Sequence, residues 1–182
     1  LMPLYVQSVM GYSAVVSGLV TLPGSFATAI VSPFAGKLYD KMGIKKIFVA
    51  GSAALVVSNI GMFFLTMNTP LYIAAGLNVI RNISIGGLMM PLLTWGTSNV
   101  DAKKVADASS LLTSFRTIAG SIGSAVFVGI MSTVSARSAA VYGEKALMHG
   151  MNISFFWMAA GAMVLLMISI FGTRSNTVNS EQ

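Results

Sequence analysis

Five long stretches of the sequence carry almost no charge, and their length limits the class of fold that the chain can form. The stretches cover residues 14–36, 47–67, 71–95, 109–134 and 153–172. A helix needs about 20 apolar residues to cross a hydrocarbon core about 30 Å thick. Charged residues make up 9% of the chain, against roughly a quarter of a soluble domain. The sequence therefore predicts an all-α, polytopic transmembrane helix bundle of five spans in a lipid bilayer.

Basic residues in the joints between the spans indicate the topology. Cytoplasmic joints of membrane proteins are enriched in Lys and Arg. This rule places the joints 37–46 and 101–107 and the C-terminus in the cytoplasm, and the uncharged turn 68–70 and the joint 135–152 outside. Residues 173–182 are polar and lack apolar periodicity, which predicts a disordered cytoplasmic tail behind a bundle of residues 1–172.

The opening residues 1–10 are too short to span a membrane and lack the charged region and cleavage site of a signal peptide. Because the predicted topology makes the first span enter from outside, a further helix must precede it. The opening residues are thus interpreted as the outer end of a sixth helix, and the chain as part of something larger.

A single arginine lies near the middle of the third span, where burial of a charge is expensive. A guanidinium at the centre of a bilayer costs roughly 2.5 to 3.5 kcal/mol on insertion scales, so it normally faces a protein interior or a wet cavity. Helical spacing places Asn78, Arg81, Asn82 and Met89 on one face. This face is a candidate substrate cavity, since amides and a guanidinium donate hydrogen bonds and Met forms an adaptable apolar wall. Alternatively, the same side chains join helices and never meet a substrate.

The fourth span carries a second arginine and several glycines. Arg116 lies about two turns into this span, so it either contributes to the cavity or reaches toward the cytoplasmic interface. Gly120 and Gly123 allow close helix packing. In the first span, Pro23, Gly24 and Pro33 interrupt the helical ladder and are either hinges or fixed kinks.

Several other functions find no support in the sequence. The chain has no cysteine and one histidine, His149, so it offers no His/Cys metal cluster and no partner set for a catalytic triad. It lacks the phosphate-binding loop of ATP-driven pumps, and its basic residues form no single stripe for nucleic acid. We therefore expect no enzyme activity, no catalytic residue, no metal and no cofactor.

The joint 37–46 carries the most specific motif. It combines Gly36, Asp40, Gly43, Lys45 and Lys46 in the pattern G-x-L-x-D-x-x-G-x-K/R. Gly43 suits a left-handed residue after a helix end, Gly36 allows another backbone to approach, and Asp40 is able to accept hydrogen bonds from free helical amides. These groups either form a gating latch or simply cap a charged loop.

The motif resembles the conserved cytoplasmic loop of the major facilitator superfamily, and its context resembles the second half of a fourteen-helix drug:proton antiporter of the EmrB/QacA type, especially the LmrB-like branch. The resemblance runs from Pro3 to about Gly172. It is carried by Pro3-Leu4-Tyr5-Val6-Gln7, Gly11-Tyr12-Ser13, Ser17-Gly18-Leu19, Leu22-Pro23-Gly24, Ser32-Pro33, Arg81, Gly86, Met89-Met90-Pro91, Arg116 and Gly120-Ser121-Ile122-Gly123-Ser124-Ala125. One departure is Thr117, where such transporters often have Gln.

The resemblance implies that the five spans are the tenth to fourteenth helices of a bacterial cell-membrane transporter, the C-terminal half of a major facilitator fold. The intact protein would export amphipathic or cationic small-molecule drugs in exchange for protons. Because the spans contain no Asp or Glu, the coupling carboxylates would lie in the missing N-terminal half, and this piece alone would be inactive. The alternative is a non-transporting membrane scaffold or assembly partner.

Overall fold

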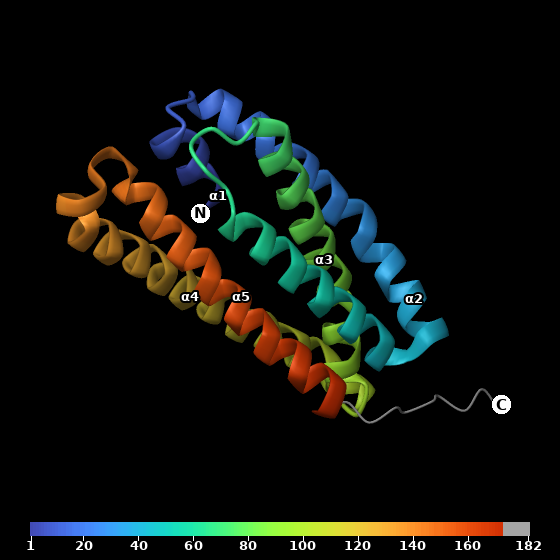
Figure 1. Ribbon diagram of the computed structural model, residues 1–182. Helices are drawn as coiled ribbons and strands as arrows, with labels where there is room; N and C mark the ends of the chain where they lie inside the picture. Colours follow the sequence, from blue (N-terminus) through green and yellow to red (C-terminus); the bar gives the residue numbers. More distant parts are fainter. Residues whose placement is uncertain (173–182) are drawn as a thin grey trace.

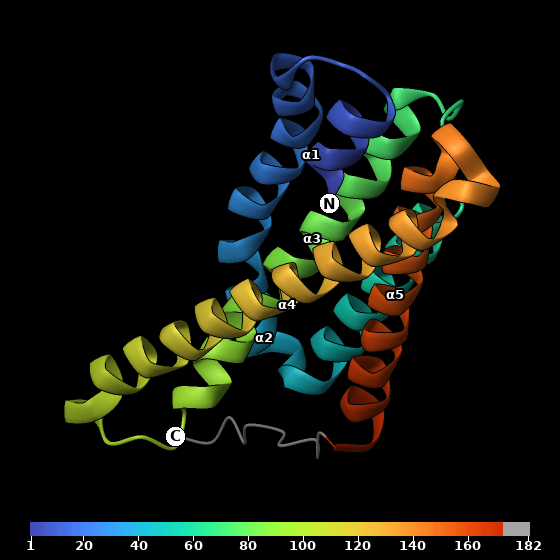
Figure 2. The same cartoon turned by 90° about the vertical axis from the view of Figure 1, so that its left-hand side faces the viewer.

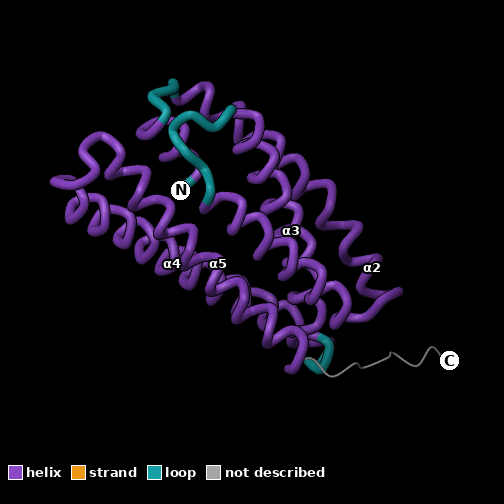
Figure 3. Tube along the Cα trace, viewed as in Figure 1, coloured by secondary structure: helices purple, strands orange, loops and turns teal. Residues whose placement is uncertain are grey.

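The computed structural model of the protein describes residues 1–172 and is helical throughout its elements (Figure 1). A short opening segment holds α1 (Met2–Leu4) and the π-helical turn η1 (Tyr5–Val9). The long helices are α2 (Ala14–Phe63), α3 (Leu71–Thr97), α4 (Val105–Tyr142) and α5 (Ala146–Gly172). The 3-10 turns η2 (Ala102–Lys104) and η3 (Gly143–Lys145) precede α4 and α5. Figure 3 shows only short connections between the helices of the described chain. The all-α prediction is confirmed, whereas the predicted tail at 173–182 lies outside the described residues.

Four segments of the described chain are long and apolar enough to cross a membrane: Ala14–Tyr39, Lys41–Phe63, Leu71–Thr97 and Ala102–Phe171. The fourth is 70 residues long and contains both α4 and α5. The chain turns back between these two helices at η3, where Gly143 has a φ of 51°. Figure 2 shows the two helices meeting near the η3 turn and diverging away from it. The described chain therefore contains the five long helices that the apolar stretches predict.

Helix α2 consists of two arms that meet at a sharp bend. We refer to residues 14–42 as the first arm and to residues 44–63 as the second arm. The break lies at Gly43, which has φ 74° and ψ 165°. The positive φ predicted for this glycine is confirmed, but ψ is far from the value of about 47° of a left-handed helical cap. The predicted cap geometry is therefore wrong, because the extended ψ leads the chain directly from one helical arm into the next.

The main apolar core lies at the end of the bundle where the chain turns at residues 64–70 and at η3. Its buried members come from the opening segment, from every long helix and from the turn after α2; they are Met2, Tyr5, Val6, Val20, Met62, Leu65, Ala74, Met131, Met148, Met151 and Phe155. The Tyr5 hydroxyl donates a hydrogen bond of 2.9 Å to the carbonyl oxygen of Thr66. The opening segment is thus fixed to the turn between α2 and α3.

The predicted joint 135–152 is wrong, because most of it is helical. Helix α4 continues to Tyr142 and α5 begins at Ala146. Gly150 of α5 packs directly against the backbone of Met131 and Ser135, and Ser154 donates a hydrogen bond of 3.0 Å to the carbonyl oxygen of Phe127. Since close packing between α4 and α5 continues beyond the apolar stretches, the helices extend past the residues that hydropathy marks.

Helix α4 has little cover from the rest of the described chain. It packs along α5, touches α3 only sparsely and crosses the other helices at a slant in Figure 2. Nearly all its residues from 106 to 130 are exposed or partly exposed, among them the large apolar side chains of Phe115, Ile118, Ile122 and Val126. One long apolar face of the bundle is consequently open.

Candidate functional site

The first arm of α2 and helix α3 meet along a polar seam. The seam consists of Gly24, Thr28 and Ser32 on the first arm and Asn78, Asn82 and Gly86 on α3. The Thr28 hydroxyl lies 3.1 Å from the carbonyl oxygen of Asn82 and 3.1 Å from that of Gly24. The Ser32 hydroxyl lies 2.8 Å from the carbonyl oxygen of Thr28. The arrangement joins two helices by hydrogen bonds in a region of few other polar groups.

The two predicted asparagines belong to this seam. Asn78 is only 5% exposed, and the Asn82 side-chain amide donates a hydrogen bond of 2.8 Å to the Asn78 carbonyl oxygen. A Cβ added at Gly24 would lie 2.7 Å from Asn82 Nδ2, and one added at Gly86 would lie 3.2 Å from Thr28 Cα. The sequence predicts either helix packing or a hinge at Gly24. In the structure, Gly24 is a point of close contact between the first arm and α3.

The sequence contains the spacing of both sides of the seam, although the sequence prediction used only the α3 side, with Asn78 and Asn82. Residues 24, 28 and 32 recur every four positions, as do residues 78, 82 and 86. Rows of small residues four apart form the ridges and grooves through which two helices pack. Thr28 was not singled out from the sequence, and Ser32 and Gly86 were not assigned to a helix contact, because neither helix reveals its partner on its own.

Pro23 and Pro33 do not break the first arm. Both lie inside α2, whose only residue with non-helical φ and ψ is Gly43. A proline removes one helical hydrogen bond without ending a helix when its surroundings stabilise the helix. The chain turns instead at Gly43, within the joint 37–46 that the sequence predicts.

Arg81 lies one residue away from the seam and takes no part in it. Its side chain is partly buried and, among the residues that the structure describes, forms no hydrogen bond or ion pair. Arg81 thus presents a positive charge on α3 that has no hydrogen-bond or ion-pair partner among the described residues.

Met89 and Arg116 meet in a separate cavity of about 400 Å³. Its wall comes from the second arm of α2, from α3, α4 and α5, and is apolar apart from Thr113 and Arg116. The Arg116 guanidinium donates from Nη1 to the Met89 sulfur atom. The structure thus brings Arg116 together with Met89, whereas Asn78 and Asn82 lie in the seam.

The remaining predicted positions have little contact with other described residues. No atom lies within 4 Å of a Cβ added at Gly36, Gly120 or Gly123. The close approaches predicted for these glycines are therefore not made within residues 1–172. Lys45 is partly exposed and Lys46 is exposed, and the side chain of Asp40 lies outside what the structure describes.

The arrangement matches a known family. The sequence model of the Major Facilitator Superfamily matches residues 1–124, which is more than half of the chain. The chain belongs to the major facilitator superfamily. The resemblance drawn from the loop motif and the span pattern is thereby confirmed.

Relatives within the superfamily include proteins from several bacteria. The chain is 32% identical over 152 residues to the lincomycin resistance protein LmrB of Listeria innocua, which covers 82% of this chain and 30% of LmrB. It is 29% identical over 169 residues to the MFS-type transporter YcnB of Bacillus subtilis, covering 93% of this chain and 36% of YcnB. It is 26% identical over 180 residues to the riboflavin transporter RibZ of Clostridioides difficile, covering 96% of this chain and 38% of RibZ. The chain thus spans about a third of the length of these relatives.

Proposed function

We propose that residues 1–172 form the C-terminal transmembrane bundle of a secondary active transporter, which exports amphipathic or cationic drugs in exchange for protons. The cavity that joins Met89 and Arg116 carries this proposal. An apolar cavity with one or two polar groups suits the binding of amphipathic molecules. Relatives named for lincomycin resistance and for multidrug resistance support drugs as the substrate class.

The proposed transport cycle is a rocking of two helical halves around a site between them, as in other secondary transporters. In this scheme the open face of α4 turns toward the N-terminal half of the same transporter. Arg81 and Arg116 would donate hydrogen bonds to acceptor groups of the substrate or pair with carboxylates of that half. The described bundle alone would not transport, since it supplies one wall of the site.

Proton coupling requires a group that changes its protonation state during the cycle. The five long apolar stretches contain no Asp or Glu. We therefore assign proton coupling to carboxylates of the N-terminal half, with the lysine-rich joints and the C-terminus on the cytoplasmic side. The loop motif around Gly43 would act as a gate between the first and second arms of α2.

Substitution of the two arginines tests the proposal in cells that produce the complete transporter. A hydrogen bond to a charged group contributes about 1.5–3 kcal/mol, so Arg116→Ala should lower drug efflux roughly tenfold or more at unchanged membrane abundance. Arg81→Ala should lower efflux likewise. Efflux of ethidium, with and without a proton uncoupler, is the measurement.

A matched control is Arg137→Ala, because Arg137 is exposed near the end of α4 and does not line the Met89–Arg116 cavity. This variant should retain normal efflux. Full efflux in proteoliposomes without any ion gradient or other energy source would overturn the secondary-transport mechanism.

The second candidate is a non-transporting scaffold, which the seam favours because it uses Asn78 and Asn82 for helix packing. This candidate predicts that Arg81→Ala and Arg116→Ala reduce the amount of protein in the membrane. Drug efflux divided by the amount of the protein in the membrane would be the same for the variants and the unaltered protein, because no drug passes through the site. Quantitative immunoblotting beside the efflux assay separates the two functions.

A further inference from the structure

A second apolar cavity of about 530 Å³ lies between the two arms of α2 and helix α3. Small residues of the second arm, Ala50, Gly51 and Ala54, form part of its wall, and Phe34 and Leu38 of the first arm are exposed beside it. This cavity shares no residue with the one that holds Met89 and Arg116. It is therefore a separate candidate site.

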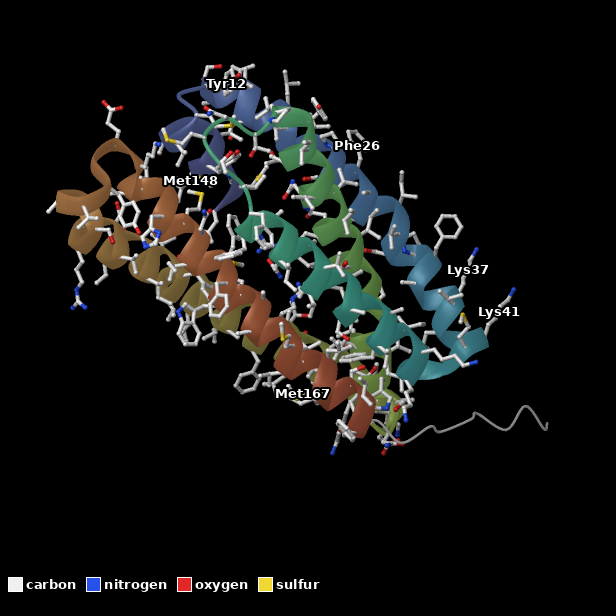
Figure 4. The ribbon with its side chains drawn as sticks, in the orientation of Figure 1. Tyr12, Phe26, Lys37, Lys41, Met148 and Met167 are labelled. Carbon is white, nitrogen blue, oxygen red and sulfur yellow. The ribbon has the colours of Figure 1, made fainter. Side chains whose placement is uncertain are left out.

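Two lysines line the same cavity. Lys37 and Lys41 are four residues apart on the first arm and at its end, so their side chains share one face. Figure 4 shows both side chains at the end of this arm, directed away from the bundle. Neither ammonium group forms an ion pair with a side chain that the structure describes, and Lys37 Nζ lies 6.0 Å from the centre of the Phe34 ring. The two charges are thus available to a ligand.

The occupant must combine an apolar body with negative charge. A wall of aliphatic and small side chains favours a hydrocarbon chain, whereas two adjacent ammonium groups favour a phosphate. In a membrane, both properties occur together in an anionic phospholipid. Basic pockets between transmembrane helices on the cytoplasmic side bind anionic headgroups.

We propose that this cavity is a binding site for an anionic phospholipid. The phosphate lies between Lys37 and Lys41, and one acyl chain enters between the arms of α2 along Ala50 and Ala54. The lysines lie at the end of an apolar helix, where the headgroup layer of a bilayer begins. An acyl chain that follows the helix away from this level runs into the hydrocarbon region, so headgroup and chain fit the cavity in one orientation.

Native mass spectrometry of the purified chain in detergent tests the site, with dioleoyl phosphatidylglycerol as the anionic probe and dioleoyl phosphatidylcholine as the zwitterionic one. We expect one phosphatidylglycerol molecule to remain bound at activation energies that remove phosphatidylcholine. Each lysine beside an anionic lipid contributes roughly fivefold in affinity, so Lys37→Gln with Lys41→Gln should weaken phosphatidylglycerol binding about tenfold or more.

The lysine pair at the other basic joint supplies a matched control. Lys103 and Lys104 are exposed in η2 and do not line the cavity. Lys103→Gln with Lys104→Gln removes the same charge, and phosphatidylglycerol binding should persist. An equal loss in both double variants would show attraction to net charge alone and would overturn the proposal.

A second variant tests the acyl-chain part of the site with both lysines intact. Ala50→Trp places a large side chain in the cavity and should weaken phosphatidylglycerol binding about tenfold, while circular dichroism reports whether the helices persist. Retention of phosphatidylglycerol in Ala50→Trp would overturn the proposed path of the chain. Equal binding of both lipids to the unaltered protein would overturn the site itself. None of these outcomes depends on drug transport, so the proposed function is tested separately.

Discussion

Gly24 is the residue through which the first arm of α2 comes closest to α3. A Cβ at this position would lie 2.7 Å from Asn82 Nδ2 and 3.0 Å from Asn78 Nδ2, too close for ordinary packing. Overpacking a tight helix contact costs about 1–3 kcal/mol. Gly24→Val should therefore lower the free energy of unfolding in detergent by this amount.

Gly18 is a suitable reference for this substitution because it lies on the same arm and no atom lies within 4 Å of an added Cβ. Gly18→Val changes the same residue type in open space and should leave thermal stability nearly unchanged. Equal destabilisation of both variants would mean that glycine is needed for the flexibility of the arm and not for the seam.

At the scale of a secondary-structure element, the bend of α2 depends on Gly43. Its φ of 74° with ψ of 165° lies in a region that is essentially restricted to glycine, where other residues incur about 1–3 kcal/mol of strain. Gly43→Ala should destabilise the bundle by this amount and alter the angle between the two arms, as measured by the distance between spin labels on each arm. Gly36 does not have a positive φ, so Gly36→Ala is the control and should change neither the stability nor the distance. An unaltered spin-label distance and stability in Gly43→Ala would contradict the role of Gly43 in the bend.

At the scale of the whole molecule, the proposed function predicts that further helices of a complete transporter cover the open face of α4. The chain contains no cysteine, so single thiols can be introduced as reporters. Ser121 is exposed on α4, whereas Ser154 of α5 is 0% exposed. In detergent, Ser121→Cys should react quickly with a maleimide in the 182-residue chain and at least tenfold more slowly in the complete transporter, whereas Ser154→Cys should react slowly in both.

Hydropathy and residue type predict the positions of the helices better than the contacts between them. Span positions follow from hydropathy because a bilayer requires long apolar helices, and the bend at Gly43 follows from a residue type that tolerates positive φ. The extension of α4 and α5 through residues 135–152 does not follow, because it depends on contacts such as Gly150 against Met131. The pairing of Arg116 with Met89 is likewise a property of two helices together.

The two ends of the bundle differ in how firmly they are held. At one end, Tyr5 ties the opening segment to the carbonyl of Thr66, and the main core joins all the long helices. At the other end, the buried cluster of the described residues is small and consists of Ile44, Phe48 and Leu88. Regions with few buried contacts open more readily than well-packed ones, so we expect the end with the smaller cluster to move more. The lysine-bearing bend of α2 lies at this end, so a lipid bound between the two arms would restrict its movement.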